Sequence, residues 1–219
     1  MKLSGLVTLN CQTELDPEQT VPDLPSVKVS RVFELTAPAS QRVSPVPVER
    51  WSKQLQDETA SWPRFAGRLH IRNARVYGTL ANHEALFKAI GPVMGHLLIG
   101  NALDDVLREI VIVRSCLHDR GAYPFRQHVR IAAESGVDRL TIMELESKDP
   151  SLRTASEQVV VKAVDELHRE SSVRDDTWDE LERHLSTEAI MDMVFTAGFY
   201  GLISLVLNAS GTQLEPGTI

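Results

Sequence analysis

The stretch of sequence that decides the fold is LREIVIVRSCLHDRGAYPFRQHVRIAAESGV, residues 107 to 137. It is typical of two helices joined by a short turn around Gly121, because apolar residues recur at intervals of three and four on both sides of that glycine. Pro124 suits the first position of the second helix, where its missing N–H would have no partner within the helix. The sequence therefore predicts a helical hairpin.

This predicted hairpin carries candidate catalytic side chains. Glu109 and Cys116 are seven residues apart, so two helical turns place them on one face of the first helix. In the second helix His128 shares a face with Pro124, and Tyr123 stands at the helix entry. If the helices pack antiparallel, Glu109 and His128 meet across the seam, and Tyr123 lines its open end. A carboxylate beside an imidazole is a general acid–base pair, but it is also typical of a surface ion pair or a satisfied polar pair in a core.

The helical pattern continues on both sides of the hairpin. It predicts helices at about 47–60, 72–81, 83–98, 103–118, 124–135, 137–146, 155–170, 175–184 and 187–208. No alternation of strands with helices appears, so we expect an all-α fold. The last helix is apolar on nearly all faces, which predicts burial between other helices or between subunits.

The first 45 residues differ from the rest. Prolines punctuate this part of the chain at positions 22, 25, 38, 45 and 47, between short runs with β character. We expect an irregular N-terminal extension over residues 1–45 and one helical domain over residues 46–219. The extension could be a disordered leader or an arm that packs on a neighbouring subunit, and the composition leaves both open.

Composition narrows the partners of the chain. Its 219 residues carry a net charge of −7, and no run of Lys and Arg is long enough to follow a phosphate backbone, which argues against nucleic acid. Cys11 and Cys116 are too few for a disulfide framework or a structural zinc site. The sequence shows neither a signal peptide nor an apolar run of membrane-spanning length. We expect a cytoplasmic protein that acts on a small molecule, away from membranes.

From about residue 44 to 216 the chain resembles the carboxymuconolactone decarboxylase and AhpD-like superfamily. The features that carry the resemblance are Arg108-Glu109 before the run IVIVR, the aromatic Tyr123, the step Gln127-His128, and an apolar helix ending in SGV. The separation of nineteen positions between Glu109 and His128 also matches. The resemblance implies an AhpD-like helical bundle around a central hairpin, and association of the helices into dimers, trimers or hexamers. We expect a homo-oligomer whose contacts include helix 187–208, with a dimer as the first expectation.

The departures from the family pattern bear on the chemistry. Its peroxidase members carry a Cys-x-x-Cys pair seven and four residues before the histidine, and those positions here are Gly121 and Pro124. Neither residue can form a thiolate, so the site lacks the paired thiols of a peroxidase cycle. Many cysteine-free relatives have Glu and Trp where Pro124 and Phe125 stand. The pocket has therefore changed in this chain.

The resemblance implies a cofactor-free lyase or isomerase that transfers a proton next to a carbonyl group, in a decarboxylation, a double-bond shift or a cyclisation. Its substrate would be a small organic acid or an intermediate of secondary metabolism. His128 would move the proton, Glu109 would orient His128, and Tyr123 would donate a hydrogen bond to the developing enolate oxygen. We expect no metal, because His118 and Asp119 at a turn with one distant histidine are a weak ligand pattern.

The candidates for contact with substrate are Arg114, Phe125 and Cys116. For Arg114 a structural ion pair is the alternative, and for Cys116 a buried place in the core. Two other functions stay open. The chain could be a non-catalytic helical oligomer that serves as a binding module, or a thiol-dependent peroxidase if Cys116 reaches the pocket.

Overall fold

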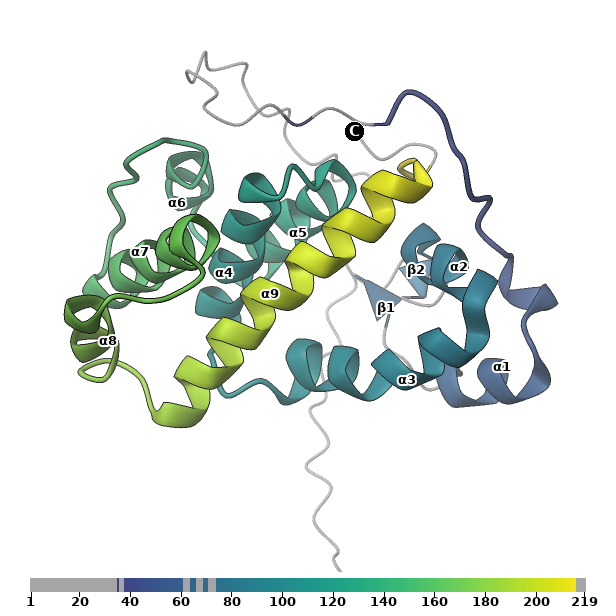
Figure 1. Ribbon diagram of the computed structural model, residues 1–219, viewed down its shortest axis with the longest axis horizontal. Helices are drawn as coiled ribbons and strands as arrows, with labels where there is room; N and C mark the ends of the chain where they lie inside the picture. Colours follow the sequence, from purple (N-terminus) through teal and green to yellow (C-terminus); the bar gives the residue numbers. More distant parts are fainter. Residues whose placement is uncertain (1–34, 36–37, 61–63, 66–68, 71–73, 216–219) are drawn as a thin grey trace, which may run out of the picture.

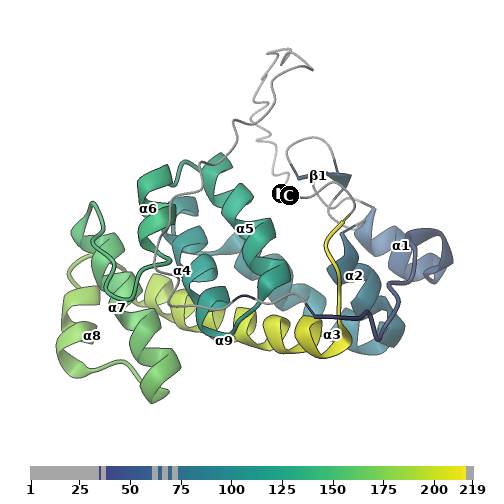
Figure 2. The same cartoon turned by 90° about the horizontal axis from the view of Figure 1, so that it is seen from above.

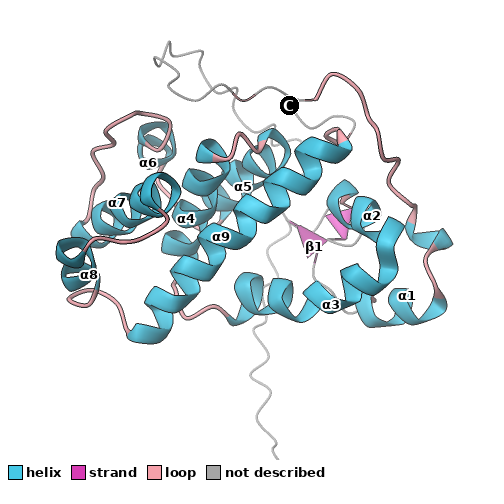
Figure 3. Ribbon diagram, in the orientation of Figure 1, coloured by secondary structure: helices cyan, strands magenta, loops and turns pink. Residues whose placement is uncertain are grey.

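The computed structural model describes residue 35 and residues 38–60, 64–65, 69–70 and 74–215, and most of these residues are helical (Figure 3). The predicted all-α fold is confirmed. Its α-helices are α1 (Lys53–Thr59), α2 (Arg75–Leu80), α3 (Glu84–Gly95), α4 (Asp105–His118), α5 (Ala122–Glu134), α6 (Arg139–Glu144), α7 (Ala155–Glu170), α8 (Asp175–Leu181) and α9 (Thr187–Ser210). Most of the expected extension, residues 1–45, lies outside the described residues.

Shorter elements join these helices. A 3-10 turn (Val48–Arg50) precedes α1, a second one, η3 (Ala81–His83), links α2 to α3, and a π-helical segment, η4 (His96–Gly100), follows α3. Two strands, β1 (Arg64–Phe65) and β2 (Leu69–His70), pair antiparallel over two residues each. This small ribbon, where no strand was expected, is the departure from a purely helical chain.

The predicted hairpin is formed by α4 and α5. Asp104 caps the start of α4, where its side chain accepts a hydrogen bond of 2.8 Å from the N–H of Leu107. Every residue of α4 from Leu107 to Leu117 is buried, because α5, α7 and α9 pack around it. In the turn, the N–H of Gly121 bonds to the carbonyl of Cys116 at 2.8 Å. Helix α5 starts two residues earlier than expected, so that Pro124 is its third residue, a position that still needs no intrahelical donor.

Helix α9 packs against α4 and α5; it crosses the middle of the view in Figure 1 and runs along one side of the molecule in Figure 2. It begins after Ser186, whose hydroxyl accepts from the N–H of Ala189, and it ends at Gly211 in the left-handed conformation. Within the described part of the chain it is the one helix long and apolar enough to cross a membrane. Half of its most apolar window is buried inside the fold, as is typical of a core helix.

The remaining helices flank this centre. Helices α6 to α8 lie on one side of α4 and α9, and α1 to α3 lie on the other (Figure 1). An extended segment, residues 38–47, ties the end of α9 to α2. The N–H groups of Arg42 and Val43 bond to the carbonyl of Ser210, and the N–H of Val46 bonds to the carbonyl of Gly78. The first turn of α2 is thereby held beside the start of α5 and the end of α9.

Candidate active site

Glu109 of α4 and His128 of α5 meet across the seam of the hairpin. The Oε2 atom of Glu109 lies 2.7 Å from Nδ1 of His128. Both side chains are buried, with exposed fractions of 1% for Glu109 and 7% for His128. The other carboxylate oxygen of Glu109 accepts a hydrogen bond of 3.2 Å from Nε of Arg108. The predicted contact is present, and the second carboxylate oxygen is satisfied as a buried charge requires.

Tyr200 of α9 completes a chain of three polar groups. Its hydroxyl lies 2.9 Å from Nε2 of His128, and the two rings meet edge to face with centroids 4.8 Å apart. Burial, and next the negative charge of Glu109, raise the pKa of Tyr200 well above its ordinary value, so its hydroxyl stays protonated. The sequence did not predict a role for this residue. It stands in an apolar helix 72 positions from His128, and no motif pointed to it.

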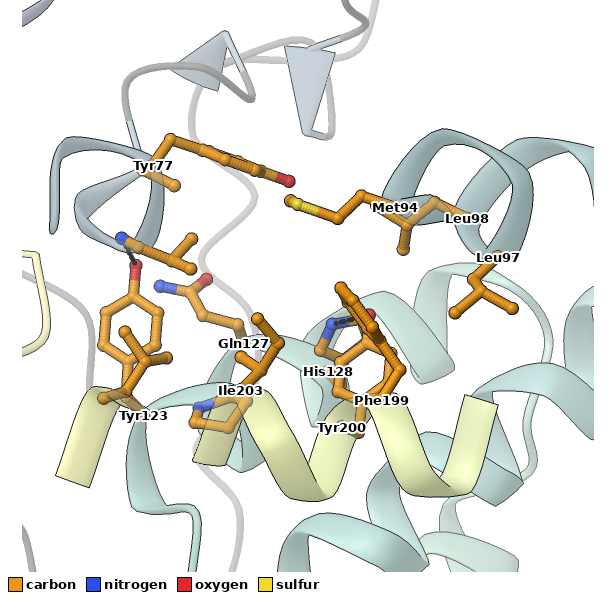
Figure 4. A pocket seen from close by; sticks show the side chains of 14 residues that line it. Tyr77, Met94, Leu97, Leu98, Tyr123, Gln127, His128, Phe199, Tyr200 and Ile203 are labelled. Carbon is orange, nitrogen blue, oxygen red and sulfur yellow. Dashed lines mark hydrogen bonds between the residues drawn. The ribbon is translucent and has the colours of Figure 1, made fainter. Parts of the chain in front are cut away.

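His128 and Tyr200 line a small, partly open cavity of about 60 Å³. Apart from Gln127 and three tyrosines, its other walls are apolar and come from α2, α3, η4, α5 and α9 (Figure 4). None of the described residues that line it is Asp, Glu, Lys or Arg. Because water competes poorly in such a space, the hydrogen bonds of His128 act at a low local dielectric.

Tyr123 lines the same cavity, but its hydroxyl is engaged elsewhere. It donates a hydrogen bond of 2.5 Å to Oε1 of Glu215 and accepts one of 3.3 Å from the N–H of Val76. Burial, followed by the charge of Glu215, raises the pKa of Tyr123. Figure 4 shows Tyr123 and His128 apart along the wall, with Gln127 between them. The expected grouping of Tyr123 with Glu109 and His128 is therefore only partly found.

Arg114 does not reach the cavity, contrary to expectation. Its guanidinium forms two hydrogen bonds with the carboxylate of Asp165 on α7, at 2.6 and 2.8 Å, and a third of 2.5 Å with the carbonyl of Leu145. The side chain is 1% exposed. Five residues beyond Glu109, Arg114 is turned away from the seam by the helical period and faces α7 instead. The alternative of a structural ion pair is the one that the structure shows.

Cys116 and Phe125 also lie away from the cavity. Cys116 is fully buried beside Ile112 and Tyr200, and burial, together with the charge of Asp119, raises the pKa of its thiol. Contrary to expectation, neither residue is among those that line the cavity, and for Cys116 the structure shows the alternative of a buried place in the core. Phe125 is half-buried and packs against the apolar side of the hairpin. Cys11 lies outside the described residues, so no second thiol can be placed near Cys116.

A second polar cluster lies where α4 ends beside α7. His118 bonds to Asp165 at 2.7 Å, His168 bonds to Asp119 at 3.0 Å, and the two imidazoles stack with centroids 4.8 Å apart. These residues pair off one histidine to one carboxylate. Over the described residues, no group of three or more His, Cys, Asp or Glu side chains has the arrangement of a metal site.

No family model matches the sequence, and no curated protein is similar to it. Solved structures are similar in fold. An uncharacterised peroxidase-related protein from Silicibacter sp. TM1040 has a TM-score of 0.68 at 15% identity, over 84% of this chain and 97% of that one. An uncharacterised peroxidase-related protein with an alkylhydroperoxidase AhpD core, from Ralstonia eutropha JMP134, has a TM-score of 0.68 at 14% identity, over 80% and 93%.

The debrominase Bmp8, in complex with 2,3,4-tribromopyrrole, has a TM-score of 0.63 at 17% identity, over 82% of this chain and 94% of that one. The agreement extends over nearly the whole of each of these proteins. The chain thus has the AhpD-like fold that its sequence resembles.

Proposed function

We propose that this protein is a lyase or isomerase that moves a proton on carbon next to a carbonyl group of a small organic acid or secondary-metabolite intermediate. The observation that supports this proposal is the row of hydrogen-bonded side chains Glu109–His128–Tyr200, of which His128 and Tyr200 face an apolar cavity. A proton can pass along these hydrogen bonds in either direction, and the reaction needs no further group for that step.

The three hydrogen-bonded side chains have a basic form, which can accept a proton, and an acidic form, which can donate one. With Glu109 ionised and His128 neutral, Nδ1 donates to Glu109, and Nε2 accepts the hydroxyl proton of Tyr200. The phenol oxygen can then take a proton from substrate while its own proton passes to Nε2. In the acidic form His128 is an imidazolium, Nε2 donates to the phenol oxygen, and the hydroxyl proton points toward substrate. Glu109 stabilises the imidazolium that this exchange creates.

These two forms cover the candidate reactions. In a decarboxylation the bond from carbon to the carboxylate breaks, carbon dioxide leaves, and its bonding electrons form a dienolate. The acidic form then protonates carbon, and solvent restores the proton. In a double-bond shift or cyclisation the basic form first takes a proton from carbon next to the carbonyl, and the acidic form returns one at another atom.

Two further features support this proposal. The apolar walls of the cavity exclude water, which strengthens the hydrogen bonds offered to a developing enolate. The debrominase with the same fold binds a small brominated pyrrole. A small ring or a short unsaturated acid is the size of substrate that a cavity of about 60 Å³ admits with modest side-chain movement.

Deuterium incorporation tests this function whichever product the reaction forms. A panel of small keto acids and unsaturated lactones is incubated with the protein in D₂O and followed by NMR. We expect deuterium on carbon next to the carbonyl of at least one compound, and its loss with His128→Asn. A signal that His128→Asn leaves unchanged, or no incorporation across the panel, would contradict the proposal.

A non-catalytic binding module is the second candidate, favoured by one observation. Helix α9 exposes Phe195, Leu202 and Leu205, with exposed fractions of 59%, 49% and 66%, as an assembly surface would. The deuterium experiment separates the two functions, since a binding module gives no deuterium exchange.

A thiol-dependent peroxidase using Cys116 is disfavoured, because the thiol is buried in the core and its pKa is raised.

A further inference from the structure

A carboxylate of the chain itself is bound at the edge of the cavity. Glu215, five positions beyond the end of α9, accepts hydrogen bonds from the hydroxyl of Tyr123 at 2.5 Å and from the N–H of Arg75 at 2.9 Å. Its second oxygen accepts a hydrogen bond from Nε2 of Gln127. Both carboxylate oxygens are thus held by donors from α2 and α5. This is the arrangement of a binding site for a carboxylate.

The donors of this site are buried and oriented. Tyr123 is 4% exposed and Gln127 is 7% exposed. The amide oxygen of Gln127 accepts a hydrogen bond of 3.1 Å from Arg130, so the amide nitrogen is the atom turned toward Glu215. The Tyr123 hydroxyl accepts from the N–H of Val76, so its own proton points at the carboxylate. The two side chains therefore keep their donors directed at this position whichever carboxylate fills it.

Glu215 itself is held less firmly than its site. It is only half-buried, and among the described residues no Lys, Arg or His forms an ion pair with it. The segment before it is anchored separately. Thr212 bonds to Thr79 at 3.0 Å, and the side chain of Gln213 bonds to the carbonyl of Pro38 at 2.9 Å. Glu215 can therefore leave the site while the preceding residues stay in place.

The carboxylate site adjoins the residues that carry the proposed reaction. Tyr123, Gln127 and His128 all line the cavity, and Gln127 precedes His128 in α5. Tyr123 and His128 are separated by five residues, about 7.5 Å along the helix axis. The cavity offers no Arg or Lys among its described lining residues, and Arg114 is committed to Asp165. Among the described lining residues, the donors that an acid substrate would meet are therefore neutral.

We propose that Tyr123, Gln127 and the N–H of Arg75 form the carboxylate subsite of the candidate active site, and that Glu215 fills it as a tethered competitor of the substrate. The identity of the site as an active site rests on the proposed function. Exchange of one carboxylate for another keeps all three donors paired, so no buried polar group is left unsatisfied during binding. Because Glu215 is attached to the protein by a short segment, that segment sets the effective concentration of its carboxylate at the site, and a free acid competes against this concentration.

The test uses crotonate, a small unsaturated acid, with crotonamide as its uncharged counterpart. Binding to the full chain is measured by NMR titration for the wild type and for Glu215→Ala. If Glu215 fills the site nine-tenths of the time, its removal tightens crotonate binding about tenfold. We expect no comparable gain for crotonamide. Crotonate that binds Glu215→Ala no more tightly than the wild type, with the fold unchanged by circular dichroism, would overturn the proposal.

Further variants show which donors account for the tighter binding of crotonate. In the Glu215→Ala background, Gln127→Leu and Tyr123→Phe should each return crotonate binding to the wild-type level or below. Gln213→Ala, which loosens the segment before Glu215 but leaves Glu215 and the donors in place, should tighten crotonate binding less than Glu215→Ala does. A tenfold gain that survives both Gln127→Leu and Tyr123→Phe would also overturn the subsite.

His128→Asn separates this proposal from the proposed function. The crotonate titration measures binding without proton transfer, whereas the comparison of the wild type with His128→Asn measures proton transfer. If deuterium incorporation depends on His128 but crotonate does not bind Glu215→Ala more tightly, the proposed function stands and the proposed subsite is wrong. If crotonate binds Glu215→Ala more tightly but no deuterium is incorporated, the carboxylate site stands and the proposed function is wrong.

Discussion

Glu109 and His128 are bonded at 2.7 Å although nineteen positions separate them in the sequence. The first prediction concerns their partnership with Tyr200. Glu109→Gln and Tyr200→Phe should each lower deuterium incorporation by a factor of about 10² to 10⁴, the usual contribution of positioned acid–base groups. Circular dichroism and thermal melting establish that each variant is folded. An activity retained by both folded variants would show that His128 acts without them.

The sequence predicted this part of the site and missed other parts for a physical reason. Glu109 and His128 lie on consecutive helices joined by a short turn, so helical period and hairpin pairing suffice to bring them together. Tyr200 and Glu215 reach the site from 72 positions beyond His128 and 92 positions beyond Tyr123. Their place depends on how α9 crosses the hairpin, which no local pattern determines.

Arg114 illustrates the same limit. The helical period showed that it leaves the Glu109 face, but the sequence could not say which helix packs there. In the structure α7 does, and Asp165 lies opposite. The ends of α9 were predicted more closely. Ser186 and Gly211 delimit α9 within two residues of the expected range, because capping residues act locally.

The second prediction follows from the burial of Arg114. Arg114→Met should lower the free energy of unfolding by about 3 to 5 kcal/mol, because Asp165 and the carbonyl of Leu145 lose their partner inside the protein. Urea denaturation measures this loss. The matched control is Arg153→Met, which removes an exposed ion pair with Asp138 and should cost less than about 1 kcal/mol. Equal effects of the two changes would contradict the structural role of Arg114.

The third prediction concerns pH and His168. Burial by itself lowers the pKa of His168, but the hydrogen bonds to Asp119 and to the carbonyl of Val164 outweigh it and raise the pKa. A folded-state pKa above the unfolded value means stability that is present below the unfolded pKa and lost as pH rises through the folded one. His168→Asn should therefore cost more free energy of unfolding at pH 5.5 than at pH 9.

Asp119→Asn provides the control for the pH effect. It should remove the part of the pH dependence that comes from Asp119, because the bond from His168 to the carbonyl of Val164 stays, and the double variant should lose no more than His168→Asn alone. The difference in unfolding free energy between pH 5.5 and pH 9 is the quantity to compare, from urea titrations at each pH. A pH dependence that persists in the double variant would place its origin in another group, with His118 and Asp165 the nearest.

The fourth prediction is a homo-oligomer that buries the outer face of α9. Leu205 and Phe195 stand exposed on this face, which a monomer would leave in water. Sedimentation of the wild type at micromolar concentration should show a dimer or larger assembly, and Leu205→Glu should shift it toward 24.4 kDa. Glu188→Lys, an exposed change in the first turn of the same helix, should leave the assembly intact. A wild-type monomer would refute this prediction.

The fifth prediction concerns the close approach of the hairpin turn to α9. A Cβ added at Gly121 would overlap the hydroxyl of Ser204 and come within 2.8 Å of its Cβ. Gly121→Ala should therefore lower the unfolding free energy by about 1 to 3 kcal/mol, as overpacking of a core does. Ser204→Gly clears both atoms and should restore part of the loss in the double variant. If the changes in unfolding free energy of the two single variants simply add in the double variant, Ser204 is not the obstacle.

The packing of α9 against the hairpin also affects how the chain reaches its native state during synthesis. The helix packs against α4 and α5, yet the ribosome makes it after both of them. Until α9 emerges, the faces of α4 and α5 that it covers stay open, and Tyr200 is not there to meet His128. Nascent chains of this protein should therefore bind holdase chaperones until about residue 210 has left the exit tunnel, and release should coincide with the closing of the cavity.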